Sequence, residues 1–219
     1  MDIFESRFAD ARYFRPFQAY LQYLSSLGEV GTVATTKPES ICFDGGVLKP
    51  WEAEDLEHYT ILFSNEELMS WHDVPTDILG SARHSVHYSS ASDKVRSLWT
   101  YMILNDAGDT CGHVELRLLG AHGRVGEISF GLLESHRGHG YMSRALTSMF
   151  AHLRSHSSVE TLVARTRSSN RNCRRLLARL AFVTTKEFEY EWMLGPCEAS
   201  DVILVKANNS LENNASTFP

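Results

Sequence analysis

The chain has 219 residues, of which 43% are hydrophobic and 22% are charged, and its formal net charge is −6. This length and apolar content allow a well-buried core in one domain with an appendage. An acidic chain without a block of Lys and Arg disfavours a nucleic-acid binder that depends on phosphate contacts, and it suits a cationic partner such as an amine.

The first 45 residues are predicted to form a helical extension followed by a linker. Aromatic and leucine side chains recur at helical intervals over residues 3–27, and Pro16 is expected to kink or divide this helix. The stripe consists of Phe4, Phe8, Phe14, Phe17, Leu21 and Leu24. Gly28 ends the helix, and residues 31–38 have the polar composition of a linker. We expect the stripe to pack on the main domain; a lid over a binding site or a homodimer contact is the alternative.

Residues 46–207 alternate between strand and helix patterns, and we expect them to form one α/β domain. The predicted elements are a strand at 47–51, a helix at 52–64, helix and loop at 66–92, strands at 99–104 and 112–119 joined by a hairpin turn at 105–109, a strand at 124–133, a helix at 140–155, a strand at 159–166, a helix at 170–180 and closing strands near 182–193 and 202–206. This order implies a mixed sheet with helices on its faces. The polar tail, residues 208–219, is predicted to be disordered.

The four cysteines indicate neither a metal site nor a disulfide framework. They are widely spaced, form no Cys-x-x-Cys pair and have no His at metal-ligand spacing. They are Cys42, Cys111, Cys173 and Cys197. The start of the chain lacks the basic and apolar regions of a signal peptide, and no apolar run approaches the length of a membrane span. We therefore predict a soluble, cytoplasmic protein with no bound metal and no membrane contact.

The most informative segment is the Gly-rich loop between the strand at 124–133 and the helix at 140–155. It contains Arg137, Gly138 and Gly140, so it presents bare backbone N–H groups at the start of a helix. Such a position binds anions, because the first helical amides are unpaired and the positive end of the helix dipole lies there. The loop lacks the Gly-Lys-Ser/Thr of a nucleoside-triphosphate loop and the full spacing of a dinucleotide fingerprint. We expect it to bind a phosphate or pyrophosphate; a Gly-rich turn that caps an ordinary helix is the alternative.

The loop and three further segments resemble the GNAT superfamily of acetyl-CoA-dependent N-acetyltransferases. Arg137-x-x-Gly140-x-Met142 resembles the family's pyrophosphate loop, with Met142 where the family has a small residue. Three segments resemble the branch that acetylates the N-terminal alanine of ribosomal proteins: Leu48 to Asp55, Glu127 to Leu132, and Asn170-x-x-Cys173-x-x-Leu176 continuing to Ala181-Phe182. The resemblance covers residues 46 to about 206 and leaves out the first 45. It implies a GNAT-like mixed α/β fold and acetyl-CoA as co-substrate.

The resemblance also implies which residues hold the cofactor. Backbone amides from Gly138 through Met142 would bind the CoA pyrophosphate, with added contacts from Arg137. The strand end at Leu132 and Leu133 would pair with the pantetheine arm, and the N–H of Leu132 would stabilise the oxyanion. The expected cofactor-binding residues are Leu132, Leu133, Arg137, Gly138, His139, Gly140, Tyr141, Met142 and Asn170. Asn170 is also expected to cap its helix. His139 could contact phosphate, but a solvated loop residue is the favoured interpretation for it.

The resemblance also implies two catalytic side chains. Glu127 would accept a proton from the attacking ammonium, and its alternative is a structural or substrate-orienting carboxylate. Cys173 replaces the branch's Ser and would protonate the departing CoA thiolate, since a thiol pKa near ~8.5 suits that leaving group. The alternative for Cys173 is a small buried thiol. A Tyr one turn further along serves in other GNAT proteins, but Leu177 stands there.

The leading interpretation is therefore transfer of acetyl from acetyl-CoA to a primary amine. A protein N-terminus and a small molecule such as a polyamine or an amine-bearing antibiotic remain open as acceptors. A non-catalytic CoA-binding regulatory module is the second interpretation, because Met142, Cys173 and Ala181 depart from the family pattern. A third is a phosphate-binding α/β protein unrelated to GNAT enzymes, which would not bind CoA.

Overall fold

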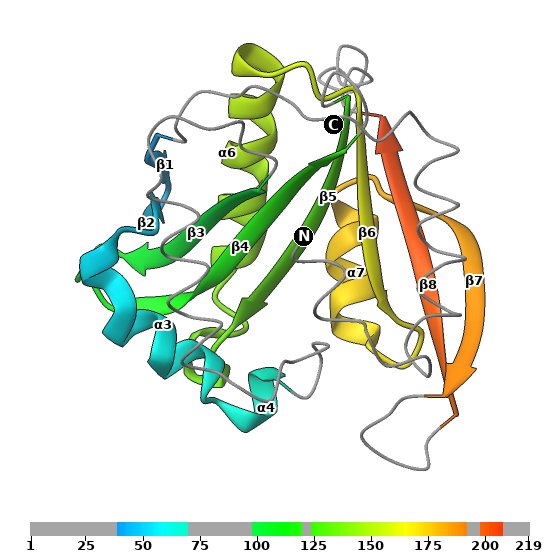
Figure 1. Ribbon diagram of the computed structural model, residues 1–219, viewed down its shortest axis with the longest axis horizontal. Helices are drawn as coiled ribbons and strands as arrows, with labels where there is room; N and C mark the ends of the chain where they lie inside the picture. The colour runs from blue at the N-terminus through cyan, green and yellow to red at the C-terminus, as the bar shows by residue number, and fades with distance from the viewer. Residues whose placement is uncertain (1–38, 70–97, 120–123, 192–197, 208–219) are drawn as a thin grey trace, which may run out of the picture.

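The computed structural model describes residues 39–69, 98–119, 124–191 and 198–207 (Figure 1). The helical stripe predicted over residues 3–27, most of the segment 66–92 and the tail 208–219 lie outside these residues. All the strands that are described belong to one eight-stranded mixed sheet in the order β1-β2-β3-β4-β5-β6-β8-β7. The mixed α/β fold predicted from the sequence is confirmed.

Most strands pair with antiparallel neighbours, and the β5–β6 pair is parallel. The strands are β1 Ile41–Phe43, β2 Gly46–Pro50, β3 Leu98–Asn105, β4 Thr110–Leu119, β5 Val125–Leu132, β6 Thr161–Arg167, β7 Val183–Glu191 and β8 Glu198–Ala207. A parallel neighbour needs a crossover connection, which the helix after β5 supplies.

The sheet begins before the boundary expected from the sequence. β1 falls within the segment 1–45 and pairs with β2, with Ile41 opposite Leu48 and Phe43 opposite Gly46. Ile41 and Phe43 are buried and belong to the main core. The rest of the predicted helical extension stays a prediction.

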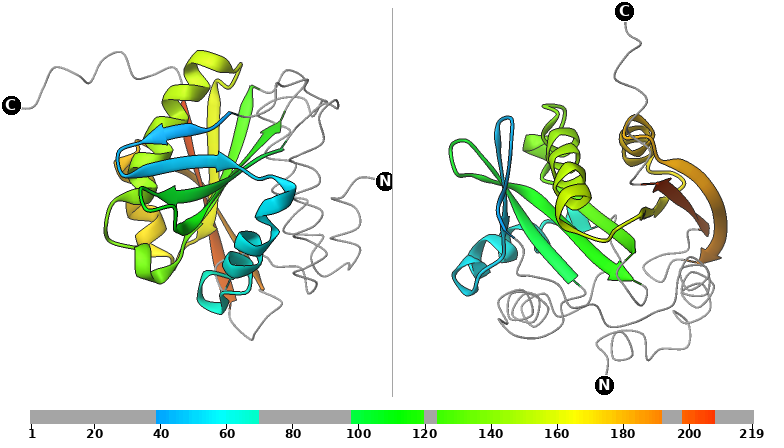
Figure 2. Two further views of the ribbon diagram at one scale, coloured as in Figure 1. Left: turned by 90° about the vertical axis from the view of Figure 1, so that its left-hand side faces the viewer. Right: turned by 90° about the horizontal axis from the view of Figure 1, so that it is seen from above.

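Helices cover both faces of the sheet (Figure 2). The helices are η1 Ala53–Asp55, α3 Leu56–Phe63, α4 Glu66–Met69, η2 Glu134–His136, α6 Tyr141–His156 and α7 Arg171–Arg179. α6 and α7 pack on one face over the main core, which includes Leu146, Phe150 and Leu177. α3 and α4 lie on the other face, where Trp51, Tyr59, Leu62, Leu68 and Met102 form a second buried cluster.

α6 follows directly from the apolar pattern of its sequence. Its buried side chains recur every three or four residues, so one stripe of the helix faces the sheet. They are Met142, Ala145, Leu146, Met149, Phe150 and Leu153. Among the described residues, no helix combines the length and the apolar character needed to cross a bilayer.

The sheet opens between β5 and β6. The two strands pair only where Val125–Ile128 lies against residues 161–164, and the register stops at Ile128 opposite Ala164. Beyond that point Figure 1 shows the two strands diverging toward the end of the sheet where α6 and α7 begin. Residues 129–132 of β5 therefore present an edge that β6 does not cover, and the opening lies directly before the Gly-rich loop.

Candidate functional site

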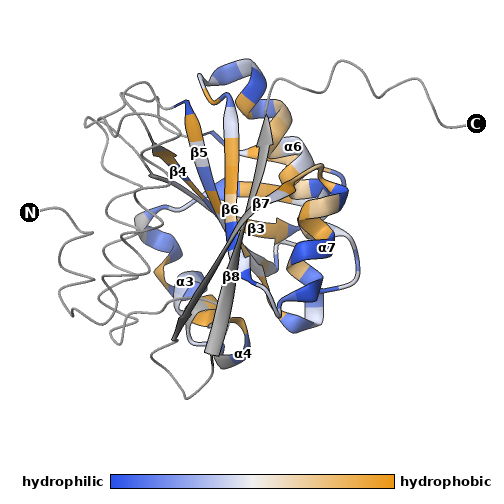
Figure 3. Ribbon diagram, turned by 90° about the vertical axis from the view of Figure 1, so that its right-hand side faces the viewer, coloured by the Kyte–Doolittle hydropathy of each residue, from blue (hydrophilic) through white to orange (hydrophobic). Residues whose placement is uncertain are grey.

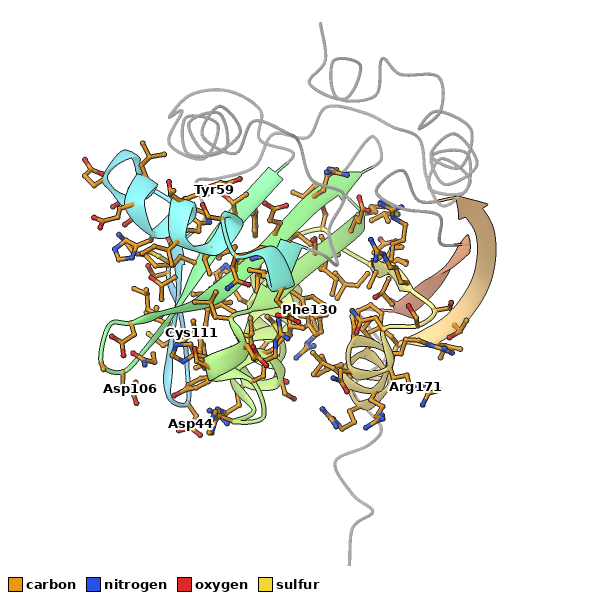
Figure 4. The ribbon with its side chains drawn as sticks, turned by 90° about the horizontal axis from the view of Figure 1, so that it is seen from below. Asp44, Tyr59, Asp106, Cys111, Phe130 and Arg171 are labelled. Atoms are coloured by element: carbon orange, nitrogen blue, oxygen red, sulfur yellow. The ribbon has the colours of Figure 1, made fainter. Side chains whose placement is uncertain are left out.

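The uncovered edge of β5 carries backbone groups that point into the opening. The N–H of Leu133 donates to the carbonyl oxygen of Cys111 on β4 at 2.9 Å. Successive N–H groups of an antiparallel strand point to alternate edges. The N–H groups of Leu132 and Phe130 therefore face away from β4, toward the space that β6 leaves. Figure 4 looks at this end of the molecule and labels Phe130 on β5 and Arg171 at the start of α7.

The loop after β5 ends in a bare helix N-terminus. Gly138 has φ +81° and Gly140 has φ +78°, a left-handed conformation that favours glycine. Gly140 is the N-cap of α6, and it has no side chain to accept from the first amides. Because the first turn of a helix leaves its N–H groups unpaired, Tyr141 and Met142 present donors at this point. Met142 keeps its bulky side chain in the core at 5% exposure, so it does not obstruct the loop.

The Arg137 side chain links the Gly-rich loop to the end of β5 by hydrogen bonds. Its Nε and Nη2 donate to the carbonyl oxygen of Leu132 at 3.0 and 2.8 Å. Its guanidinium also forms an ion pair with Glu67 of α4, with Nη1 2.6 Å from Oε1. The guanidinium thus lies on the open edge of β5 and is shared between a carbonyl and a carboxylate. Contact between Arg137 and a pyrophosphate stays a prediction.

A second arginine lies beside the same loop. Arg144 donates from Nη1 to the carbonyl oxygen of His139 at 2.9 Å and from Nε to that of Asp44 at 2.5 Å. Its guanidinium carbon lies 5.2 Å from the ring centroid of Tyr141. His139 itself is exposed, as a solvated loop residue would be. Arg144 therefore joins the β1–β2 turn to the start of α6 and places a positive charge next to Gly140.

Glu127 lies in an ion pair with Arg117. The two residues are opposite each other on β5 and β4, and Arg117 Nη1 lies 2.8 Å from Glu127 Oε2. The Glu127 side chain is 14% exposed and that of Arg117 is 29% exposed. Ile128, the next residue on β5, faces the core under α6. Because side chains alternate along a strand, Glu127 lies on the sheet face opposite α6.

Cys173 lies in the first turn of α7, on the other side of the opening. Asn170 caps this helix, because its Oδ1 accepts from the N–H of Cys173 at 3.1 Å. The predicted capping role of Asn170 is confirmed. Burial raises the pKa of the Cys173 thiol to about 11, and a hydrogen bond with Thr166 partly offsets this effect. The thiol therefore keeps its proton throughout the neutral range. Its pKa lies well above the value of ~8.5 that was expected to suit a leaving CoA thiolate.

Comparison with known families identifies the fold. A family model described as an acetyltransferase (GNAT) domain matches residues 47–183. The chain belongs to the GNAT acetyltransferase family. No curated protein matches the sequence significantly.

Solved structures share this GNAT fold at low sequence identity. A ribosomal-protein-S5-alanine acetyltransferase from Vibrio fischeri is 16% identical, with a TM-score of 0.64 over 78% of this chain and 97% of that chain. A ribosomal L7/L12 alpha-N-protein acetyltransferase, RimL, is also 16% identical, with a TM-score of 0.65 over 77% and 94%. A spermidine N-acetyltransferase from Vibrio cholerae in complex with CoA and spermine is 14% identical, with a TM-score of 0.65 over 75% and 96%.

Three residues of this candidate site were not predicted from the sequence. They are Glu67, Arg117 and Arg144. Arg144 could have been predicted from the sequence, because it is a cation four residues after Gly140 and therefore lies one helical turn after the loop. No sequence pattern identifies Glu67 or Arg117, because their partners are fixed by tertiary packing and by strand register.

Proposed function

We propose that this GNAT protein transfers the acetyl group of acetyl-CoA to the primary amine of a small molecule or of a protein N-terminus. The observation that carries the proposal is the position of an uncovered β5 edge directly before a bare helix N-terminus. A pantetheine arm resembles a peptide and can pair with such an edge, and a pyrophosphate binds at such a helix start. Coenzyme A carries both groups in this order along its length.

In this proposal the cofactor is held mainly by backbone groups. The N–H groups of residues 138–142 face the pyrophosphate, and the edge of β5 at Leu132 faces the pantetheine arm. Arg137 holds the loop against β5 through the Leu132 carbonyl, and Arg144 adds positive charge beside Gly140. Asn170 caps α7 at its first turn, on the other side of the opening.

Acetyl-CoA supplies the acetyl group as a thioester. The N–H of Leu132 points into the opening, so it can donate to the acetyl carbonyl oxygen as negative charge develops there. Rigid backbone donors need no reorganisation during the reaction, which is why a strand end suits this role.

Glu127 is the proposed proton acceptor for the amine. An amine arrives as ammonium near neutral pH and must lose a proton before it attacks, and a carboxylate can take that proton directly or through water. Glu127 lies on the face opposite α6, so an amine would reach the opening from the side away from the pyrophosphate loop. Arg117 bonds one carboxylate oxygen, Oε2. An orienting role for Glu127 is therefore the competing possibility.

Cys173 is the proposed proton donor to the departing sulfur. Its thiol is protonated over the neutral range, because burial raises its pKa to about 11. The same burial argues against a thiolate nucleophile, since the reactive form of cysteine is the thiolate. Direct transfer from acetyl-CoA to the amine is therefore favoured over an acetyl-cysteine.

The acceptor is an amine in each named relative. The neighbours include acetyltransferases for ribosomal proteins and for spermidine. Both acceptor classes present a primary amine, which supports the proposed chemistry and leaves the acceptor itself to experiment.

The test is a free-CoA release assay with acetyl-CoA and a panel of N-terminal peptides, polyamines, amino acids and aminoglycosides. Binding of CoA is measured alongside by thermal shift. Turnover with one class supports the proposal and names the acceptor class. Stabilisation by CoA with no turnover across the panel favours the non-catalytic module, and no stabilisation by CoA contradicts a cofactor site altogether.

A further inference from the structure

One face of α7 concentrates positive charge. Arginine accounts for four of its nine residues, and the helix contains no Asp or Glu. The arginines are Arg171, Arg174, Arg175 and Arg179, all exposed. Within the described part of the chain, none of them forms an ion pair; Arg174 donates to the Ser168 carbonyl at 3.1 Å. Figure 3 shows hydrophilic residues on the outer side of α7, and Leu177 is buried on its inner side.

These positive charges are unfavourable for the stability of α7 itself. Arg171 is followed by Arg174 and Arg175 at three and four residues, and Arg175 by Arg179 at four, so like charges are neighbours on the helix surface. The cations of the first half also lie at the positive end of the helix dipole. An external anion bound to this face would relieve both effects.

The arginines border a hollow of ligand size. A cavity of about 320 Å³ is lined by Arg171, Arg174, Arg175, Ala178, Phe182 and Thr184. This volume lies at the lower end of the range for small-molecule sites, roughly 300–1,000 Å³. The lining thus combines three arginines and a threonine with the apolar residues Ala178 and Phe182.

The hollow is separate from the proposed coenzyme A site. α7 lies between α6 and β7 (Figures 1 and 2), and Phe182 and Thr184 complete the hollow at the start of β7. Cys173 and Leu177 lie on the face of α7 that packs toward the core. The hollow and the opening beside β5 are thus on different sides of the same helix.

We propose that this hollow binds a small phosphate-bearing anion of nucleotide size. Arginine forks match phosphate oxygens with two parallel hydrogen bonds, which lysine does not do. The Thr184 hydroxyl can donate to the same group, and the exposed Ala178, with the buried Phe182 beneath the hollow, gives its floor an apolar character. This site is independent of acetyl transfer, and its occupant need not be a substrate.

The test measures binding of ATP, AMP, inorganic phosphate and a polyglutamate peptide by calorimetry, with saturating CoA present so that the Gly-rich loop before α6 is filled. Binding of CoA and of dephospho-CoA is measured separately. Ionic strength is held constant with chloride, because exposed charges are screened by salt. We expect a nucleotide to bind and the double variant R174Q/R175Q to weaken that binding at least tenfold. The control R154Q removes an exposed arginine from α6 and should leave nucleotide affinity unchanged.

Four results would overturn the proposal. They are no binding of any probe, equal binding by R174Q/R175Q and R154Q, tighter binding of a polyglutamate peptide than of a nucleotide, and weaker binding of CoA but not of dephospho-CoA in the double variant. The last would assign the arginines to the 3′-phosphate of the cofactor. Removing like charges should not lower the Tm of the double variant; if the Tm falls, the single variant R175Q takes its place.

Discussion

The two sides of the opening are built from different chemical groups. On the β5 side the groups that face the gap are backbone amides, from the strand edge at Leu132 to the bare start of α6 at Gly140. On the α7 side they are side chains, because Asn170 caps the helix with its own oxygen and Cys173 follows it. The first turn of α6 has no side-chain cap, and the first turn of α7 is capped by Asn170.

This contrast predicts where the protein tolerates substitution. A site made of backbone donors depends on φ and ψ, so it is sensitive to changes at glycine and insensitive to most other side chains. A site made of side chains depends on their identity. Arg137 and Arg144 add guanidinium groups on the β5 side, and Glu127 is the one exception there whose side chain is the proposed reactive group.

The largest effect is expected at that exception. Glu127→Gln removes the proposed proton acceptor while it keeps the shape of the side chain, so kcat should fall about 100-fold and the affinity for CoA should stay unchanged. The measurement is kcat and its pH dependence, with the CoA Kd from calorimetry.

The matched control for Glu127 is its ion-pair partner. Arg117→Gln leaves the carboxylate in place and should lower kcat much less than Glu127→Gln. Equal losses in the two variants would show that the ion pair, not proton transfer, is what matters, and Glu127 would then be an orienting residue.

The next largest effect is expected at the bare helix start. A side chain at Gly140 is strained at φ +78°, and its Cβ would lie 2.8 Å from Arg144 Nη1. Gly140→Val should therefore raise the Kd for CoA at least about tenfold, since it disturbs the amides and the neighbouring cation together. Gly108→Val is the control, because Gly108 has a similar φ of +85° and a Cβ added there would meet no atom within 4 Å. A similar loss of CoA affinity in both variants would point to general destabilisation and not to the loop.

A smaller effect is expected at Cys173. Cys173→Ala should lower kcat about five- to tenfold, and Cys173→Ser should be milder because a hydroxyl keeps a proton donor there. An alanine variant with unchanged kcat would leave Cys173 a packing residue.

The raised pKa of Cys173 also fixes the sign of its contribution to stability. Burial lifts the pKa from 9.0 to about 11, so the folded state holds the proton more tightly than the unfolded state. This contribution is fully present below pH 9 and is lost as the pH rises toward 11. Its size is at most about 3 kcal/mol, from 1.36 kcal/mol per pKa unit. Cys173→Ser should flatten that part of the alkaline stability curve, measured by urea unfolding from pH 8 to 11.

The local part of this site was predictable from the sequence, and the long-range part was not. Helices predicted at 140–155 and 170–180 are observed at Tyr141–His156 and Arg171–Arg179, because glycine and asparagine caps act within one turn. The pairs Arg137–Glu67 and Arg144–Asp44 join residues 70 and 100 positions apart, and no local pattern encodes them. The pKa of Cys173 depends on burial, which only the packed fold determines.

The smallest effect concerns the end of α7, where the sequence departs from the family's glycine. Ala181 has φ +64°, and it follows the helix in a Schellman motif in which the N–H of Phe182 donates to the Leu177 carbonyl at 2.9 Å. A left-handed conformation costs an L-residue about 1–2 kcal/mol, and glycine avoids that cost but loses about 0.5–1 kcal/mol of chain entropy. Ala181→Gly should therefore stabilise the fold by about 0.5–1 kcal/mol, seen as a higher urea midpoint with an unchanged m-value.

Ala178→Gly is the matched control for this last substitution. Ala178 lies within α7 and is exposed, so glycine there should destabilise the fold by up to about 1 kcal/mol. Opposite signs for the same change three residues apart would show that backbone conformation sets the effect. If both variants lose stability, the left-handed turn at Ala181 is not strained, and the end of α7 accepts alanine as readily as glycine.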